Sequence, residues 1–223
     1  MPIPVSSMKR KNIFMNNQVS LRIHSVKCVD ETGGNFAEKF GNDEIKAGAV
    51  GITAGAHAVK TGPTVIGMNF DDGETVRFSP PKKLIDLRLT DANSFPKTCF
   101  AILLLAEIDN GGFSGKINTI FNRVKQEIGD RLPVAAGGGI GVGPLPGPQL
   151  GLIGEVVKPI VLNFIESQLR SGLSDDVFPA RYLSVTVSSN GNLSTGGTVS
   201  PQFEVEFRGH GGVYRMTCDW ALS

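Results

Sequence analysis

The chain has 223 residues, and its 40% hydrophobic and 19% charged content is ordinary for a soluble globular protein. Lys and Arg number 22 against 21 Asp and Glu, so the basic excess typical of nucleic-acid binding is missing. No run of 18 apolar residues exists, which excludes an ordinary membrane-spanning helix. Residues 1–16 lack an apolar signal-peptide stretch, so we expect a flexible tail there. The sequence does not determine the localisation, and export of the protein without a cleavable signal peptide remains an alternative.

The first half of the sequence alternates apolar and polar residues, a period that predicts short β-strands. We expect these strands at 19–29, 44–55, 62–70, 74–79, 83–90 and 97–109. The turn signal Asp71-Asp72-Gly73 predicts a hairpin that pairs the third strand with the fourth, and Pro80-Pro81 is expected to end the fourth. The last run is almost wholly apolar, which is typical of a central strand buried on both faces.

The period changes after residue 112, where apolar residues recur at spacings of three and four. Phe113 to Ile128 is therefore predicted to form an amphipathic helix of about four turns. A Gly- and Pro-rich segment follows from Leu132 to Gly154, and a second amphipathic helix is expected from about Leu150 to Ser171. Both helices are explained most simply if they cover one face of a sheet.

The period of two returns at 181–189, 202–209 and 213–222. We therefore predict a mainly β fold, an antiparallel β-sandwich of about eight or nine strands. Residues 17–223 would form this single domain, with the amphipathic helical pair inserted at about 113–172. The three cysteines fall within predicted strands and are expected as small buried residues, although one disulfide is left open.

Acidic residues gather in three loops at predicted strand ends. Calcium takes six to eight oxygen ligands, and carboxylates from separate loops can supply them while the ion offsets their mutual repulsion. The alternative is that these residues are ordinary turn and cap residues. The candidate metal ligands are Asp30, Asp43, Glu107, Asp109, Asp175 and Asp176.

Two of these loops carry a resemblance to a known family. The stretches LRIHSVKCVD, GNDEIKAGAV and FAILLLAEIDNGG resemble the calcium- and lipid-binding β-sandwich of synaptotagmin and conventional protein kinase C. Asp30 matches that family's loop aspartate, Asp43 its Ser-Asp-Pro-Tyr aspartate, and Glu107-Ile108-Asp109 its acidic pair. The sequence departs from the pattern where Glu44-Ile45 replaces Pro-Tyr. The resemblance implies bound calcium as the cofactor and membrane lipid as the partner.

The segment from Pro133 to Gly154 has no charged residue and eight glycines. Surface loops are normally polar, so an uncharged apolar connector is expected either to be covered by other parts of the protein or to contact a partner. In the resembling family, apolar loop tips enter lipid, so we expect a membrane-contacting role here. The candidate membrane-contacting residues are Ile140, Val142, Leu145, Leu150, Leu152 and Ile153.

These observations favour a calcium-dependent membrane-binding module, of the kind found in a secreted effector or pore-forming toxin. The main alternative is a structural or self-assembling protein-interaction sandwich, which binds a protein surface or forms a homo-oligomer through exposed sheet edges. A carbohydrate-binding module ranks third, with Trp220, Tyr182 and Tyr214 as its stacking platforms. No Gly-x-Ser-x-Gly elbow or Walker loop occurs, and we expect no enzymatic activity.

Overall fold

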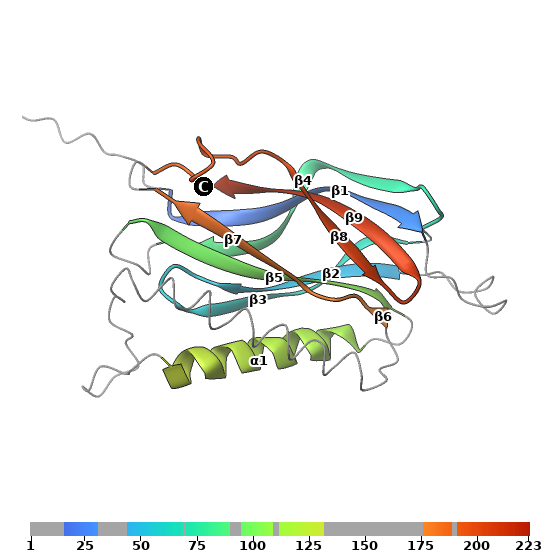
Figure 1. The fold of residues 1–223 in the computed structure, drawn as a ribbon, viewed down its shortest axis with the longest axis horizontal. Coiled ribbons are helices and arrows are strands. Elements are labelled where there is room, and N and C mark those ends of the chain that lie inside the picture. Colours follow the sequence, from blue (N-terminus) through green and yellow to red (C-terminus); the bar gives the residue numbers. More distant parts are fainter. Residues whose placement is uncertain are drawn as a thin grey trace, which may run out of the picture.

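Two antiparallel sheets pack face to face, and one helix lies against the outer side of one of them (Figure 1). The computed structural model describes residues 16–30, 44–68, 70–89, 95–108, 112–131, 176–188 and 191–223. The elements are β1 (Gln18–Asp30), β2 (Glu44–Ile52), β3 (Ala58–Met68), β4 (Thr75–Arg88), β5 (Lys97–Ile108), α1 (Phe113–Arg131), β6 (Asp176–Val177), β7 (Arg181–Val187), β8 (Phe203–Gly209) and β9 (Gly212–Leu222).

Sheet A has the strand order β4-β1-β9-β8. Sheet B has the order β3-β2-β5-β6, and β7 pairs with β5 on the same side as β6. All these pairings are antiparallel. The prediction of a mainly β, antiparallel sandwich is therefore confirmed, and the described part of the chain contains nine strands.

Strand β5 shows how the apolar residues divide between two cores. Every second side chain faces sheet A and joins the core between the sheets, and the others face outward into a second cluster beneath α1. The inward set is Cys99, Ala101, Leu103 and Leu105, and the outward set is Phe100, Ile102, Leu104 and Ala106. The prediction that this strand is buried on both faces is confirmed.

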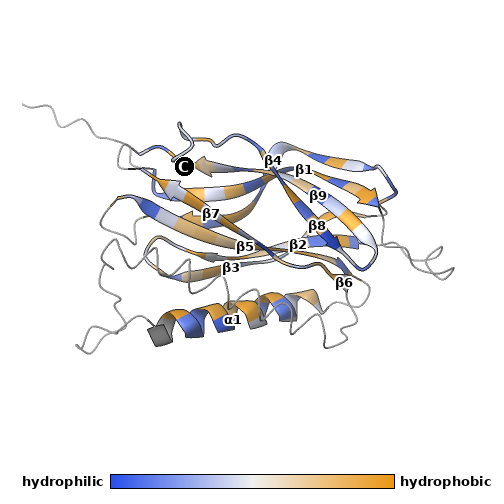
Figure 2. Cartoon of the chain, viewed as in Figure 1, coloured by the Kyte–Doolittle hydropathy of each residue, from blue (hydrophilic) through white to orange (hydrophobic). Residues whose placement is uncertain are grey.

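Helix α1 packs its apolar stripe on the outer face of sheet B, mainly over β3 and β2 (Figure 2). Its buried residues recur at helical spacing: Phe113, Ile117, Ile120 and Val124. Gly48 of β2 permits this close approach, since a Cβ there would lie 2.4 Å from Ile117 Cδ1. The first predicted helix is confirmed, whereas the second, at 150–171, lies outside the described residues.

The predicted hairpin at Asp71-Asp72-Gly73 is wrong. Strand β3 belongs to sheet B and β4 to sheet A, so this turn connects the two sheets. Gly73, with φ of 82°, donates its N–H to the carbonyl of Cys28 at 3.0 Å, which ties the turn to β1. An Asp-Gly turn was correctly recognised, but its partner strand is not the one that sequence adjacency suggested.

The prediction that Pro80-Pro81 ends a strand is also wrong. Strand β4 continues through both prolines from Thr75 to Arg88. It lies at the edge of sheet A, where a residue without an N–H breaks no ladder hydrogen bond on the open side. The cysteine prediction is confirmed, because all three cysteines are buried and none of them forms a disulfide.

Candidate functional site

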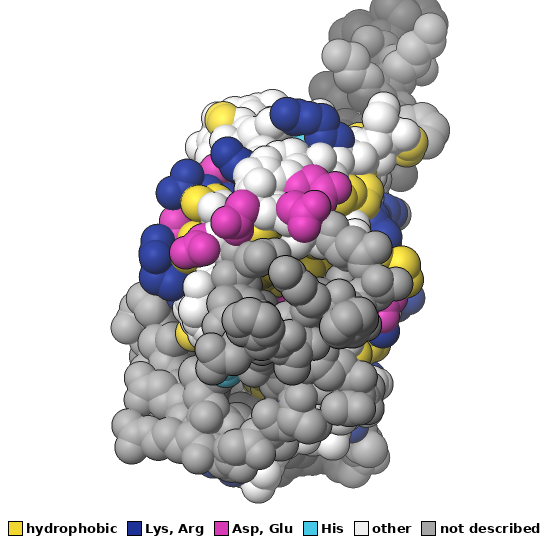
Figure 3. Space-filling model, turned by 90° about the vertical axis from the view of Figure 1, so that its right-hand side faces the viewer, with side chains coloured by type: hydrophobic (Ala, Val, Ile, Leu, Met, Phe, Trp, Pro, Cys, Tyr) yellow, Lys and Arg dark blue, Asp and Glu magenta, His cyan; other side chains and the backbone are white. Residues whose placement is uncertain are grey.

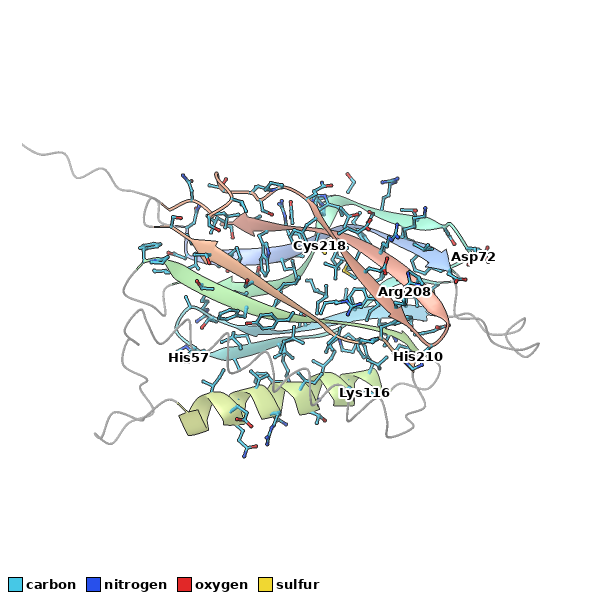
Figure 4. All side chains as sticks on the ribbon, in the orientation of Figure 1. His57, Asp72, Lys116, Arg208, His210 and Cys218 are labelled. Atoms are coloured by element: carbon cyan, nitrogen blue, oxygen red, sulfur yellow. The ribbon has the colours of Figure 1, made fainter. Side chains whose placement is uncertain are left out.

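One end of the sandwich collects acidic residues from both sheets, at the right in Figure 1. Strand β1 ends there, β2 and β6 begin there, and β5 ends there, because antiparallel neighbours reverse direction. Asp72 and His210 lie at the same end (Figure 4), and Figure 3 shows Asp and Glu side chains on this surface. We call this the acidic end, and its described carboxylates are Asp30, Glu44, Asp71, Asp72, Glu74 and Glu107.

Glu107 is the buried member of the acidic end. It follows Ala106, which faces the helix, so strand alternation directs its side chain between the two sheets. The residue is 5% exposed. It lies in register with Ile45 of β2 and with Asp176 of β6. Burying a carboxylate is costly unless it is paired or bound to a cation, and Glu107 does have an interaction partner in the structure.

Glu44 points to the opposite side of sheet B. Its neighbour Ile45 is fully buried in the core between the sheets, and the Glu44 carboxylate forms an ion pair with Lys46 at 2.6 Å. Because its charge is balanced there, Glu44 is a poor candidate for a ligand beside Glu107.

The exposed acids belong to β1 and to the turn before β4. The N–H of Cys28 donates to the Glu74 carbonyl at 2.9 Å, which holds the turn beside β1. The Glu74 carboxylate accepts a hydrogen bond from the Asp71 N–H at 3.1 Å. Asp71 and Asp72 thereby lie at the same end as Asp30. Sequence reasoning missed this proximity because it treated the turn as a hairpin within one sheet.

The predicted metal ligands are therefore only partly described. Asp30 and Glu107 are at the acidic end, and Asp176 begins β6, although its side chain is not described. Three predicted ligands lie outside the described residues: Asp43, Asp109 and Asp175. The residues next to two of them in the chain, Glu44 and Ile108, are register partners. Within the described ranges, no three His, Cys, Asp or Glu residues are grouped closely enough to hold a metal ion.

All six predicted membrane-contacting residues also lie outside the described residues: Ile140, Val142, Leu145, Leu150, Leu152 and Ile153. Among the helices that the structure describes, none is long and apolar enough to cross a membrane.

Aromatic side chains pack against one another in the interior next to the acidic end. Phe178 and Tyr214 meet edge to face with ring centroids 5.3 Å apart, and Phe70 meets Tyr214 in the same manner at 5.8 Å. His210, in the β8–β9 turn, places Nε2 3.1 Å from the Val177 carbonyl of β6. Tyr214 and Trp220 are buried, so they cannot serve as the sugar-stacking platforms that the third hypothesis requires.

A second polar cluster, which sequence reasoning missed, lies on the outer face of sheet A. Arg22 donates from Nε and Nη2 to the two Asp219 carboxylate oxygens at 2.8 and 2.5 Å. His24 Nε2 lies 2.9 Å from Asp219 Oδ2, and His24 Nδ1 lies 3.1 Å from Gln202 Nε2. The Asp219 side chain is only 3% exposed. Asp219 was missed because it lies within the apolar run of β9, whereas sequence reasoning considered acidic residues in loops.

The surroundings of Asp219 act on its pKa in opposite directions. Burial raises the pKa of this carboxyl, but hydrogen bonds and positive charge from Arg22 and His24 lower it, and the net result is a lowered pKa. In the adjacent residue, burial and the Asp219 charge raise the pKa of the Cys218 thiol to about 12. Cys218 is therefore an inert core residue, and the Arg22–Asp219 pair joins β1 to β9.

Comparison with known proteins returns no match in any of three searches: no family model, no curated protein and no solved structure resembles this chain detectably. The functional argument therefore depends on the residues themselves.

Proposed function

We propose that this chain is a non-enzymatic calcium-binding β-sandwich that docks on a membrane or partner surface through its acidic end. The observation that carries the proposal is the meeting of acidic strand ends from both sheets at one end of the sandwich, where Glu107 is buried between the sheets. A divalent cation offsets the mutual repulsion of carboxylates that meet in this way.

The donor set suits calcium in its chemistry. Hard carboxylate oxygens drawn from several loops are the ligands that calcium prefers. Asp30 and Glu107 would supply two of them, from sheets A and B respectively. Six to eight oxygens are needed, so the remaining ligands would come from neighbouring acids in the sequence, namely Asp43, Asp109, Asp175 and Asp176.

An exposed apolar side chain beside the acidic end favours docking on lipid. Met68, at the end of β3, is 61% exposed and lies in register with Glu44. Val65 of the same strand is 40% exposed. A cation that bridges carboxylates to anionic headgroups, flanked by apolar side chains, is a combination suited to a membrane surface.

The second helix of the inserted pair forms part of the proposal. Helix α1 packs mainly on β3 and β2, yet the outer face of sheet B is also buried along β5. There Phe100 stacks on Tyr182 with centroids 5.6 Å apart, and both Ile102 and Ala180 are buried. An amphipathic helix at 150–171 has the apolar face required to cover these residues.

The self-assembly alternative is weakened by the described sheet edges. Lys82 of β4 donates to the Val65 carbonyl of β3 at 2.6 Å, and Arg181 of β7 donates to the Glu206 carbonyl of β8 at 2.6 Å. Each bond occupies an edge acceptor that a second copy would need for strand pairing. Pro63 in β3 adds a position without a donor.

The test is calorimetric titration of calcium into the full chain after chelating-resin treatment. We expect saturable binding that Glu107→Gln weakens by at least about tenfold, or about 1.4 kcal/mol. Asp86→Asn is the matched control, because Asp86 pairs in register with Ser20 near the start of β1, toward the other end of the sandwich. Sedimentation with phosphatidylserine vesicles should require calcium. Absence of saturable calcium binding, or equal loss in both variants, would remove the proposal.

A further inference from the structure

The outer face of sheet A carries six polar side chains in two cross-strand rows. In β1, Val26 and Cys28 are fully buried, so the residues before each of them, Ser25 and Lys27, face outward. The same alternation applies to the flanking strands, where Val76 of β4 packs on the core and Met216 of β9 is buried. The six outward residues form what we call the cation–hydroxyl patch: Ser25, Lys27, Thr75, Arg77, Arg215 and Thr217.

The strand register fixes how these six residues are arranged. Lys27 lies opposite Thr75 on one side and opposite Arg215 on the other, which forms the first row. Ser25 lies opposite Arg77 and Thr217 in the same way, which forms the second row. Strands are about 4.8 Å apart and alternate residues about 6.8 Å apart, so three cations and three hydroxyls share a small area. Each row continues on β8 to a glutamate, Glu206 beside Arg215 and Glu204 beside Thr217.

The positive charges of Lys27 and Arg77 are not balanced by ion pairs with the described residues, whereas that of Arg215 is. Lys27 and Arg77 are exposed diagonal neighbours, and neither has an ion pair or side-chain hydrogen bond within the described ranges. Arg215 is engaged by Glu204 at 3.5 Å and by Glu206 at 3.1 Å. Like charges that are neighbours on a sheet repel each other, so the unpaired Lys27 and Arg77 favour a bound anion between them.

We propose that the cation–hydroxyl patch binds a phosphate group. Guanidinium and ammonium groups form charge-assisted hydrogen bonds to phosphate oxygens, and flanking hydroxyls donate further ones. The two unpaired cations, Lys27 and Arg77, match a group with two negative charges better than a single carboxylate. The phosphate comes either from a lipid headgroup or from a soluble phosphate compound, and both present the same oxygens to the patch.

This site is separate from the proposed calcium site in residues and in chemistry, so each can fail without the other. The probe for this site is pyrophosphate, titrated calorimetrically into the full chain. The buffer is freed of metal with chelating resin, because a dissolved polyanionic chelator would compete with pyrophosphate for the patch. Vesicles of phosphatidylcholine with or without phosphatidic acid form the second arm, measured by sedimentation in the same buffer.

We expect saturable pyrophosphate binding that the double variant Lys27→Gln, Arg77→Gln weakens at least tenfold. Arg88→Gln is the matched control, because Arg88 is an exposed cation elsewhere on β4, and it should bind as the unmodified chain does. If the chain sediments with phosphatidic acid vesicles and the double variant does not, the ligand is a lipid headgroup. If the chain binds pyrophosphate but does not sediment with these vesicles, the ligand is a soluble phosphate compound. No saturable binding, or equal weakening by Arg88→Gln, overturns the proposal.

Discussion

The two outer faces of the sandwich differ in what covers them. The outer face of sheet B is apolar and is buried beneath α1, whereas the outer face of sheet A is polar and laced with ion pairs. The strand sequences explain the contrast, since β5 is apolar on both sides and β1 alternates strictly over most of its length. The outer face of sheet B therefore contributes to stability by packing against α1, whereas the outer face of sheet A is the surface available to a ligand.

The largest effect is expected where α1 covers sheet B. Phe113 is 1% exposed at the start of the helix, and Phe113→Ala should lower the free energy of unfolding by about 3–5 kcal/mol through lost burial and an unfilled cavity. Urea unfolding followed by circular dichroism measures it. Phe121→Ala is the control, since Phe121 is only partly buried against the same cluster and should cost less. A loss below about 1 kcal/mol for Phe113→Ala would show that the helix contributes little to stability.

A smaller effect is expected from Asp219, whose carboxylate is nearly buried on the outer face of sheet A. Asp219→Asn leaves Arg22 without its charge partner, and we expect a loss of about 1–3 kcal/mol, reduced by the partial exposure of that guanidinium. Denaturant unfolding at neutral pH tests this value, and an unchanged midpoint would show that the pair contributes nothing net.

The same pair should respond to acid in a defined direction. Because the pKa of Asp219 is lowered on folding, its contribution is fully present above the ordinary aspartate pKa of 3.8 and is lost as the pH falls through the lower folded-state value. The stability difference between the unmodified chain and Asp219→Asn should therefore shrink below pH 3.8. A difference that stays constant through this acid range would contradict the assignment.

The smallest effect is expected from an exposed ion pair on the same face. Lys83 is 3.2 Å from Asp86, and its side chain is 50% exposed. Lys83→Gln should change the unfolding free energy by no more than about 0.5 kcal/mol, because exposed pairs are solvated and screened. Thermal unfolding in low and high salt measures it, and a loss as large as that of Asp219→Asn would mean that burial does not distinguish the two pairs.

Local sequence patterns predicted the elements well where the pattern was long. The apolar run of β5 and the helical spacing from Phe113 to Ile128 were both interpreted correctly. The acidic strand ends were also recognised as a shared feature, and Asp30 and Glu107 do lie at one end of the sandwich. Whether these residues bind calcium remains a prediction.

Long-range pairing was predicted less well, for a physical reason. The Asp71-Asp72-Gly73 turn has the same local chemistry whether the next strand returns to the same sheet or crosses to the other. Pro80-Pro81 likewise ends a strand in a sheet interior but not at an edge, and edge position is a tertiary property. The Arg22–Asp219 pair joins residues from opposite ends of the sequence, so no local window contains both.

By itself, the sequence determined the kinds of element in this protein, because side-chain periodicity and backbone preference act over a few residues. Only the tertiary structure decided which strands became neighbours, which face α1 covered, and which charges met. Those outcomes depend on contacts between residues distant in the chain, whose free energies local patterns do not encode.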